Sequence, residues 1–191
     1  MTALPIGSFW ISPEEYLEGE LLAEFKHEYV AGQVHGMAGA SRDHNLIAAN
    51  MSGNLWNHRR GKRCTVFTSD MKVKIPREWA DAYYYPDVSV GCDPTDQARY
   101  FLERPSLIVE VLSPDTSHID RREKRLAYRA IPSMQLYLIL EQDRIAATVL
   151  RRSPEGWREE QLEGVDALLR LDPVELECRL GLLYERTSLM A

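Results

Sequence analysis

Two acidic residues interrupt segments that otherwise have the pattern of buried β-structure. Asp87 lies in YYYPDVSV, where Val88 and Val90 alternate with Asp87 and Ser89 in the period of a strand. Glu110 lies in SLIVEVLSP, whose length and β-branched content are typical of a strand covered on both faces. A buried, unpaired carboxylate is costly, so each should be protonated, paired or bound to a cation. One hard divalent cation with oxygen ligands would account for both.

A lysine follows on the next predicted element. Pro114 ends the strand, Asp115, Thr116 or Ser117 can cap a helix, and DRREKRLAYRAI continues it to Ile131, which precedes a proline. At about 100° per residue, Lys124 borders the core, on the flank that also holds Asp120 and Tyr128. The predicted buried stripe contains Ile119, Leu126 and Ala130.

Other roles are open for each of these residues. An aspartate after proline is a common turn feature, and a buried arginine could replace a metal beside Glu110. Lys124 could pair with Asp120 along the helix, and Tyr128 could be a core residue. A single metal site accounts for the acids and the lysine together, whereas the other roles need three separate explanations.

The same residues carry a resemblance to a known family. Pro86-Asp87, then Glu110 in an apolar strand, then a lysine, resembles the PD-(D/E)XK nuclease superfamily. YPDVSV followed by LIVEVLSPDTSHIDRREKRLAYRAIPSMQLYLIL is similar to the Uma-type restriction endonuclease family. One position departs from the superfamily pattern: Leu112 stands two residues after the glutamate, where the lysine is usual. In the Uma-type family the lysine is on the helix, which implies Lys124.

The resemblance implies a fold, a site and partners. The implied fold is α/β, a restriction endonuclease-like core with a mixed central β-sheet flanked by helices. Asp87, Glu110 and Lys124 would be catalytic, and Asp87, Glu110 and Asp70 would bind Mg²⁺ or Mn²⁺. Glu28 would be an accessory residue beside the metal. The implied partner is nucleic acid, with DNA as the expected substrate, and the implied assembly is a homodimer.

Glu28 and Asp70 each have a simpler interpretation. Glu28 could be an exposed glutamate at the start of a strand, and Asp70 could occupy a turn or bulge. A histidine, His44, resembles one near a helix start in the family, where local hydrogen bonding is its more common role.

Such a site would have the parts that phosphodiester hydrolysis needs. A divalent cation makes water more acidic and offsets charge on the phosphate, and a lysine ammonium supplies a further point charge. The sequence leaves open whether one or two metals act. Two other functions also stay open: a catalytically inactive module that binds nucleic acid or protein on the same fold, and a metal-dependent hydrolase of small phosphate esters.

Length and composition predict one domain over residues 1–191. With 45% hydrophobic and 27% charged residues, the chain has the composition of a globular protein. No segment has the length of a membrane span and the N-terminal residues lack the basic region of a secretion signal, so we expect a cytoplasmic protein without a membrane partner. Cys64, Cys92 and Cys178 have no paired spacing, so we expect core or strand residues and neither a disulfide framework nor a zinc site.

The net charge of −6 is unevenly distributed. Residues 1–28 contain six acids and one base, and residues 154–191 contain nine acids and four bases. Residues 29–153 contain eighteen bases and fourteen acids, which makes this middle part net +4. A basic middle is compatible with contact to a phosphate backbone.

Local signals predict the remaining elements. Ser12-Pro13-Glu14-Glu15 predicts a capped helix to about Ala23, and KHEYVAGQVHGM predicts a hairpin at Ala31-Gly32. Ser41 should begin a structural helix that Gly61 can end. Its basic end at residues 58–63 is either a solvated helix terminus or a contact for phosphate, with the solvated terminus the more common role. Strands are expected in CTVFTSDMKVKI, MQLYLILE and RIAATVLRR, with a further strand near Trp157.

Overall fold

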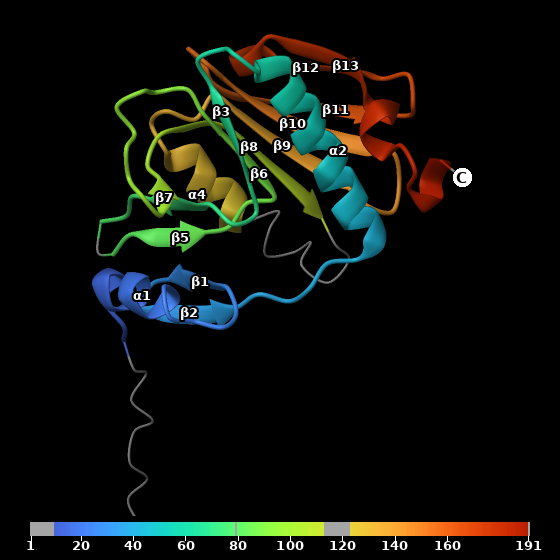
Figure 1. The fold of residues 1–191 in the computed structure, drawn as a ribbon. Helices are drawn as coiled ribbons and strands as arrows, with labels where there is room; N and C mark the ends of the chain where they lie inside the picture. The colour runs from blue at the N-terminus through green and yellow to red at the C-terminus, as the bar shows by residue number, and fades with distance from the viewer. Residues whose placement is uncertain (1–9, 79, 113–122, 191) are drawn as a thin grey trace, which may run out of the picture.

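The computed structural model describes residues 10–78, 80–112 and 123–190, and combines mixed β-sheets with a few helices (Figure 1). The helices are α1 (Pro13–Glu20), α2 (Arg42–Arg59) and α4 (Arg125–Ala130). The strands are β1 (His27–Val30), β2 (Gln33–Gly36), β3 (Thr65–Thr68), β4 (Lys72–Ile75), β5 (Ala82–Tyr84), β6 (Val88–Gly91), β7 (Phe101–Leu102), β8 (Pro105–Leu112), β9 (Leu136–Glu141), β10 (Ala146–Ser153), β11 (Gly156–Glu163), β12 (Leu168–Leu171) and β13 (Leu176–Arg179). Short 3₁₀ turns η2 (Asp172–Val174), η3 (Leu180–Tyr184) and η4 (Ser188–Met190) complete the C-terminal part.

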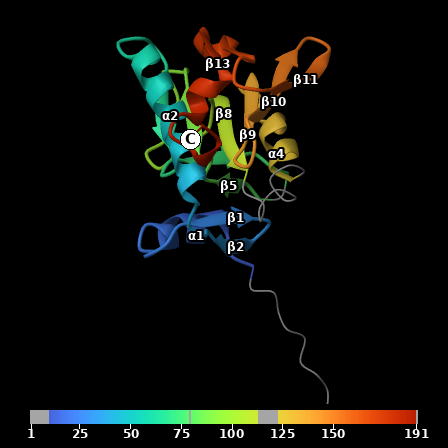
Figure 2. The same cartoon turned by 90° about the vertical axis from the view of Figure 1, so that its right-hand side faces the viewer.

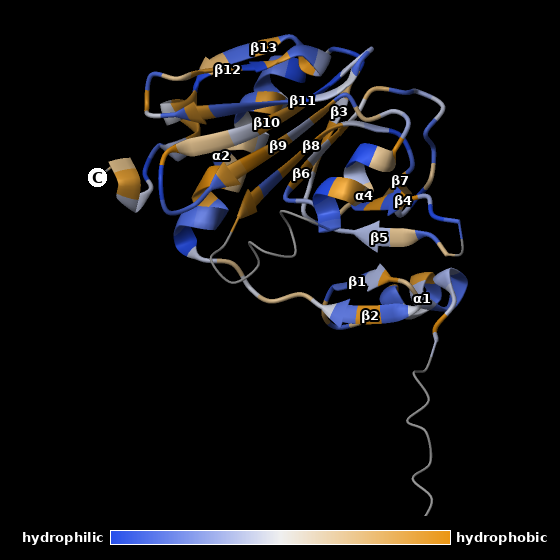
Figure 3. Cartoon of the chain, turned by 180° about the vertical axis from the view of Figure 1, so that it is seen from behind, coloured by the Kyte–Doolittle hydropathy of each residue, from blue (hydrophilic) through white to orange (hydrophobic). Residues whose placement is uncertain are grey.

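The central sheet has six strands in the order β11-β10-β9-β8-β6-β3. Strands β8 and β9 are parallel, and the other neighbours are antiparallel. Every residue of β8 and β9 is buried, and β6, β8 and β9 form the hydrophobic centre of the sheet (Figure 3). The predicted strand around Glu110 is therefore confirmed, with both of its faces covered.

The two faces of this sheet carry separate hydrophobic clusters. Leu107, Val109 and Val111 pack with the apolar side of α2, whereas Ile108 and Leu112 pack with α4 and with a second sheet. Figure 2 shows α2 on one side of the central strands and α4 on the other. Glu110 alternates with Ile108 and Leu112, so it faces the α4 side.

The second sheet has five strands in the order β2-β1-β5-β4-β7. Its β1–β2 hairpin turns at Ala31 and Gly32, with φ values of 50° and 83°, as the sequence predicts. Ser12 and Glu15 form the predicted capping box of α1, although the helix ends at Glu20 rather than near Ala23. This sheet is the support that holds Glu28, on β1, near the central sheet.

The buried face of α4 differs from the one that the sequence predicts. Leu126 is 63% exposed and Ala130 is also exposed, while Ala127 and Tyr128 are buried. The prediction of a Leu126–Ala130 stripe was wrong, because it treated leucine as core and lysine as flank. The buried face is instead built from Lys124 and Tyr128, one turn apart. The helix ends before Ile131 as predicted, but its predicted start and Asp120 lie outside the described residues.

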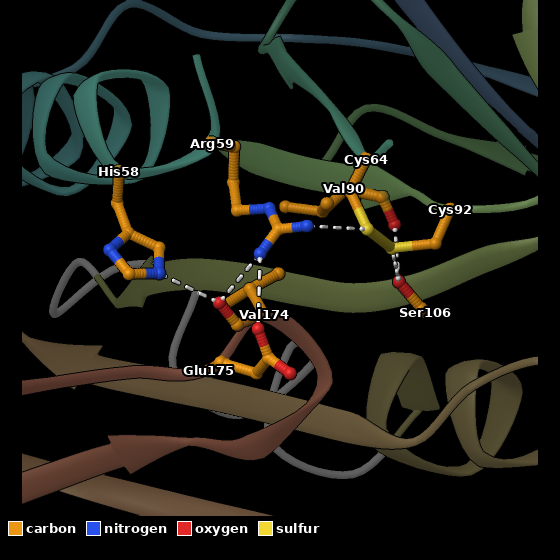
Figure 4. Close-up of a disulfide and its surroundings, with 8 residues drawn as sticks. All are labelled: His58, Arg59, Cys64, Val90, Cys92, Ser106, Val174 and Glu175. Carbon is orange, nitrogen blue, oxygen red and sulfur yellow. Dashed lines mark hydrogen bonds and ion pairs between the residues drawn. A yellow bond between two sulfur atoms is a disulfide. The ribbon is translucent and has the colours of Figure 1, made fainter. Parts of the chain in front are cut away.

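The expectation that the chain has no disulfide was also wrong. Cys64 and Cys92 form one, and Cys178 is a free, half-buried thiol (Figure 4). Cys64 precedes β3 and Cys92 follows β6, and the pairing of Thr65 with Gly91 places the cysteines opposite each other. A separation of 28 residues in the sequence gives no sign of this strand register. The last residues of α2 lie beside the disulfide, with the Arg59 guanidinium 3.7 Å from the sulfur of Cys64.

We predict that the Cys64→Ser/Cys92→Ser double variant is less stable than the parent by about 3 kcal/mol, because it no longer closes a loop of this length in the unfolded chain. Urea unfolding without reductant measures the difference, and Cys178→Ser is the matched control, with a smaller effect. Alkylation in denaturant without reductant should label one thiol of the parent. Labelling of three thiols would contradict the disulfide.

Candidate active site

Lys124 lies at the start of α4 and is 8% exposed. Its Nζ atom is 2.9 Å from Oε1 of Glu28 and 3.5 Å from Oε1 of Glu110. The ammonium also lies 5.4 Å from the centroid of the Tyr84 ring. The lysine thus joins three elements, β1, β8 and α4, inside the protein.

Glu110 has a second donor on α4. The Tyr128 hydroxyl donates to Oε1 of Glu110 over 2.9 Å. Burial raises the pKa of Tyr128 well above its usual value, and the charges of Glu110 and Glu28 raise it further. Tyr128 is therefore a neutral hydrogen-bond donor throughout the physiological pH range, and it holds the Glu110 carboxylate in place.

Glu28 links the lysine to the segment that contains Asp87. Its Oε1 atom accepts a hydrogen bond from the backbone N–H of Tyr85 at 3.2 Å, in addition to its contact with Lys124. Tyr85 is followed directly by Pro86-Asp87. The sequence treats Glu28 as accessory, but the structure makes it the closer of the two carboxylates to the lysine ammonium.

Asp87 immediately precedes β6, and it lies at the same level of the sheet as Glu110, because Val88 pairs with Val109 across the antiparallel strands. Its Oδ2 atom accepts from the backbone N–H of Val111 at 2.7 Å, so the two acids are connected through one peptide unit. Its Oδ1 atom is 2.9 Å from Nε2 of His44. The Asp87 side chain is 16% exposed, which leaves it in contact with the surface.

His44 contacts Asp87, and the sequence does not reveal this pairing. Ser41 caps α2 by accepting from the His44 backbone N–H, and this cap sets the first turn of the helix beside Asp87. The expected local role of the histidine side chain was wrong, since it reaches across to another element. The sequence signals were its place near a capped helix start and its resemblance to a histidine of the family, and neither identifies a partner 43 residues away.

Comparison with known proteins identifies the family. The Uma2 family model, described as "Putative restriction endonuclease", matches residues 13–182. The chain belongs to this family. Two proteins of Synechocystis sp. (strain ATCC 27184 / PCC 6803 / Kazusa) are similar: the uncharacterised slr1290 is 38% identical over 147 residues, covering 76% of each chain. The uncharacterised sll1609 is 36% identical over 135 residues, covering 69% of this chain and 75% of its own.

A solved structure supports the fold. The crystal structure of a "putative nuclease belonging to DUF820" from Anabaena variabilis ATCC 29413 superposes with a TM-score of 0.75. It covers 91% of this chain and 97% of the other, at 20% sequence identity. The predicted restriction endonuclease-like α/β fold is therefore confirmed for this Uma2-family chain.

Asp70 lies apart from the buried charges. It occupies the turn between β3 and β4, its side chain is 86% exposed, and its Oδ1 atom is 3.0 Å from Nζ of Lys26. The turn interpretation of this residue matches its position. It lines the same surface groove as Asp87, which is the extent of its association with the other candidate ligands.

The donor set can be tested against a divalent metal. Within residues 10–78, 80–112 and 123–190, no group of three or more His, Cys, Asp or Glu side chains is arranged to hold a metal ion. Mg²⁺ needs only one or two carboxylates, because it keeps several waters, and each carboxylate has about four lone-pair sites. Asp87 and Glu110 supply two such groups at one level of the sheet, so they fit the ion, whereas the three-carboxylate set with Asp70 is not assembled.

A second polar network, around Tyr85, supports the contacts of Glu28 and Lys124. Lys72 is buried and donates to the Tyr85 hydroxyl at 3.0 Å, and that hydroxyl donates to Glu20 at 2.9 Å. Glu20 is also paired with His27 at 3.0 Å. Burial lowers the pKa of Lys72, with Glu20 opposing the shift. These contacts fix Tyr85, whose backbone N–H holds Glu28.

We predict that Lys124→Met destabilises the fold by about 3–5 kcal/mol, because it removes the cation shared by the buried Glu110 carboxylate and the partly buried Glu28 carboxylate. Urea unfolding measures the loss. Adding Glu28→Gln to this variant should recover part of it, since one buried charge is removed. A Lys124→Met protein as stable as the parent would show that the lysine does not neutralise these acids.

Proposed function

We propose that this chain is a divalent-metal-dependent endonuclease that hydrolyses phosphodiester bonds in DNA. The observation that carries the proposal is the buried Lys124 ammonium within hydrogen-bonding or ion-pairing distance of both Glu110 and Glu28. Membership of a family described as "Putative restriction endonuclease" supports it. Three separately predicted residues, Glu28, Glu110 and Lys124, thus meet at one place.

In the proposed reaction, Asp87 and Glu110 would hold Mg²⁺ or Mn²⁺. A cation of this kind supplies positive charge that offsets the charge developing on the phosphate. Hydrogen bonds from Val111 and Tyr128 keep the two carboxylates oriented without neutralising them. Fixed orientation matters because the binding groups then need no rearrangement during the reaction.

Lys124 provides the second positive charge. Its ammonium orients the attacking water or stabilises the phosphate as its charge increases, and the low dielectric of the site strengthens the effect. Glu28 is a positioning residue, since it holds the ammonium and is itself held by the Tyr85 backbone N–H. Asp70, which lines the same groove as Asp87, is proposed as an outer acidic residue of the metal site.

Other features of the molecule stay proposals. We propose a homodimer, because a duplex presents two strands to two sites, and a single domain over residues 1–191. Among the described helices, none has both the length and the apolar composition needed to cross a membrane. We also propose a cytoplasmic location. The Cys64–Cys92 disulfide makes this location worth testing, because disulfides are uncommon in cytosolic proteins.

The test is incubation of supercoiled plasmid with the protein and Mg²⁺ or Mn²⁺. We expect nicked and linear products that EDTA abolishes. Glu110→Gln and Asp87→Asn should each lower the rate by about 10²-fold or more, because each removes charge from the proposed cation site. Lys124→Met should do the same, in the fraction that remains folded by circular dichroism.

The matched control is Glu163→Gln, which makes the same chemical change at an exposed position on β11. It should cleave plasmid at the parent rate. Asp70→Asn tests the role of Asp70. A small loss of cleavage rate indicates an outer role, and a loss equal to that of Asp87→Asn indicates direct metal ligation. Plasmid binding without cleavage, or hydrolysis confined to small phosphate esters, would contradict the proposal.

A further inference from the structure

A groove runs along α2 from Asp87, which is the proposed metal ligand nearest to this helix. Its volume is about 840 Å³, and it is bounded by α2 on one side and by β3 and the β3–β4 turn on the other. Asp87 and His44 line it at the start of the helix, and Trp56 lines it near the helix end. His44 and Trp56 are twelve residues apart, so the groove follows about 18 Å of helix. That length matches about five steps along one nucleic-acid strand.

Trp56 is unusual for a residue of α2. The apolar face of this helix, Ile47, Met51 and Leu55, is fully buried, but Trp56 is 56% exposed while still lining the groove. A large ring in this position presents an aromatic surface to whatever occupies the groove. Gly53, one turn earlier, leaves the space open: an added Cβ there would meet nothing within 4 Å.

Positive charge is found beyond the Trp56 end of the groove. Arg60, Lys62 and Arg63 are exposed in the turn that follows α2. The Arg59 guanidinium contacts the carbonyl oxygen of Val174 and the carboxylate of Glu175 (Figure 4). These contacts anchor the end of α2, so Arg59 is not one of the exposed cations. An acidic protein with net charge −6 therefore has a local basic cluster at the far end of this groove.

We propose that the groove binds a single-stranded stretch of nucleic acid that leads to the candidate active site. Trp56 stacks on an unpaired base, and Arg60, Lys62 and Arg63 contact phosphates. The occupant is a single strand because a duplex covers both faces of its internal bases, leaving none for the tryptophan ring. This inference rests on the proposed nuclease function and specifies its substrate: DNA with an unpaired segment, such as a flap or a melted region, rather than uninterrupted duplex.

Binding is measured by fluorescence anisotropy with fluorescein-labelled thymidine oligonucleotide and with a duplex of equal length. EDTA is present, so that cleavage plays no part. We expect the single strand to bind more tightly than the duplex. Trp56→Ala should weaken single-strand binding by about 5- to 100-fold, which is the range for loss of one base–aromatic stack, and Trp56→Phe should keep most of the affinity.

Trp10→Ala is the matched control, because Trp10 is exposed to the same degree, 59%, but lies elsewhere, beside Gly32. It should leave binding unchanged. Replacing Arg60, Lys62 and Arg63 with alanine should reduce the slope of log affinity against log salt by about 2, as expected for three single-strand phosphate contacts. Gly53→Glu introduces a carboxylate into open space, so it should fold normally and weaken binding.

The outcomes separate this inference from the proposed function. Trp56-dependent binding by a protein that cleaves no plasmid or flap substrate would support the groove and reject the nuclease. Cleavage that Trp56→Ala and Gly53→Glu leave unchanged, or equal losses from Trp10→Ala and Trp56→Ala, would reject the groove. Duplex binding as tight as single-strand binding would also reject it.

Discussion

The shared contact of Lys124 with Glu28 and Glu110 is the interaction on which the arrangement of this site depends. A buried ammonium loses its hydration, and the protein compensates only if acidic partners come close in good geometry. Here the partners come from different sheets: Glu28 from β1 of the five-stranded sheet and Glu110 from β8 of the six-stranded sheet. The lysine therefore couples the two sheets, and its position reports whether both are correctly placed.

Aromatic packing makes these charges effective. Tyr128 lies edge-on to Tyr84 and Tyr137, with ring centroids 5.8 and 5.2 Å apart, and these rings shield the buried end of α4 from water. Burial raises the pKa of Tyr84 to about 12, which also keeps that hydroxyl neutral. Among the residues that the structure describes, Glu28, Glu110 and Lys124 thus meet in a setting of low dielectric constant. Electrostatic interactions are stronger there than between the same groups at the surface.

Prediction from the sequence succeeded where one short segment contained the whole signal. The all-buried strand with Glu110, the capping box of α1 and the Ala31-Gly32 hairpin are local patterns, and each appears in the structure. Features that depend on distant partners were not predictable in this way. The Cys64–Cys92 disulfide needs the β3–β6 register, and the His44–Asp87 contact needs α2 placed against the end of β6.

The prediction of the buried face of α4 was wrong for a different reason. Ranking side chains by hydrophobicity assigned Leu126 to the core, whereas the buried face holds Lys124 and Tyr128 because Glu110 needs donors there. Satisfying a buried carboxylate outweighed burying one leucine, which is consistent with the larger cost of an unpaired buried charge. The family resemblance implies a role for Lys124, whereas periodicity places this residue only on the flank of the helix.

The position of Glu110 on one face of β8 accounts for the departure from the superfamily pattern at Leu112. A residue two positions after Glu110 lies on the same face of β8, and Leu112 is indeed buried on the α4 side with Ile108. A lysine at that position would reach the carboxylate along the strand. Lys124 reaches it from the helix packed over that face, so the ammonium acts on the same side of the sheet in either arrangement. In the proposed reaction the positive charge is needed on the face of β8 that carries Glu110, and a helix covering this face can supply it as directly as the strand itself.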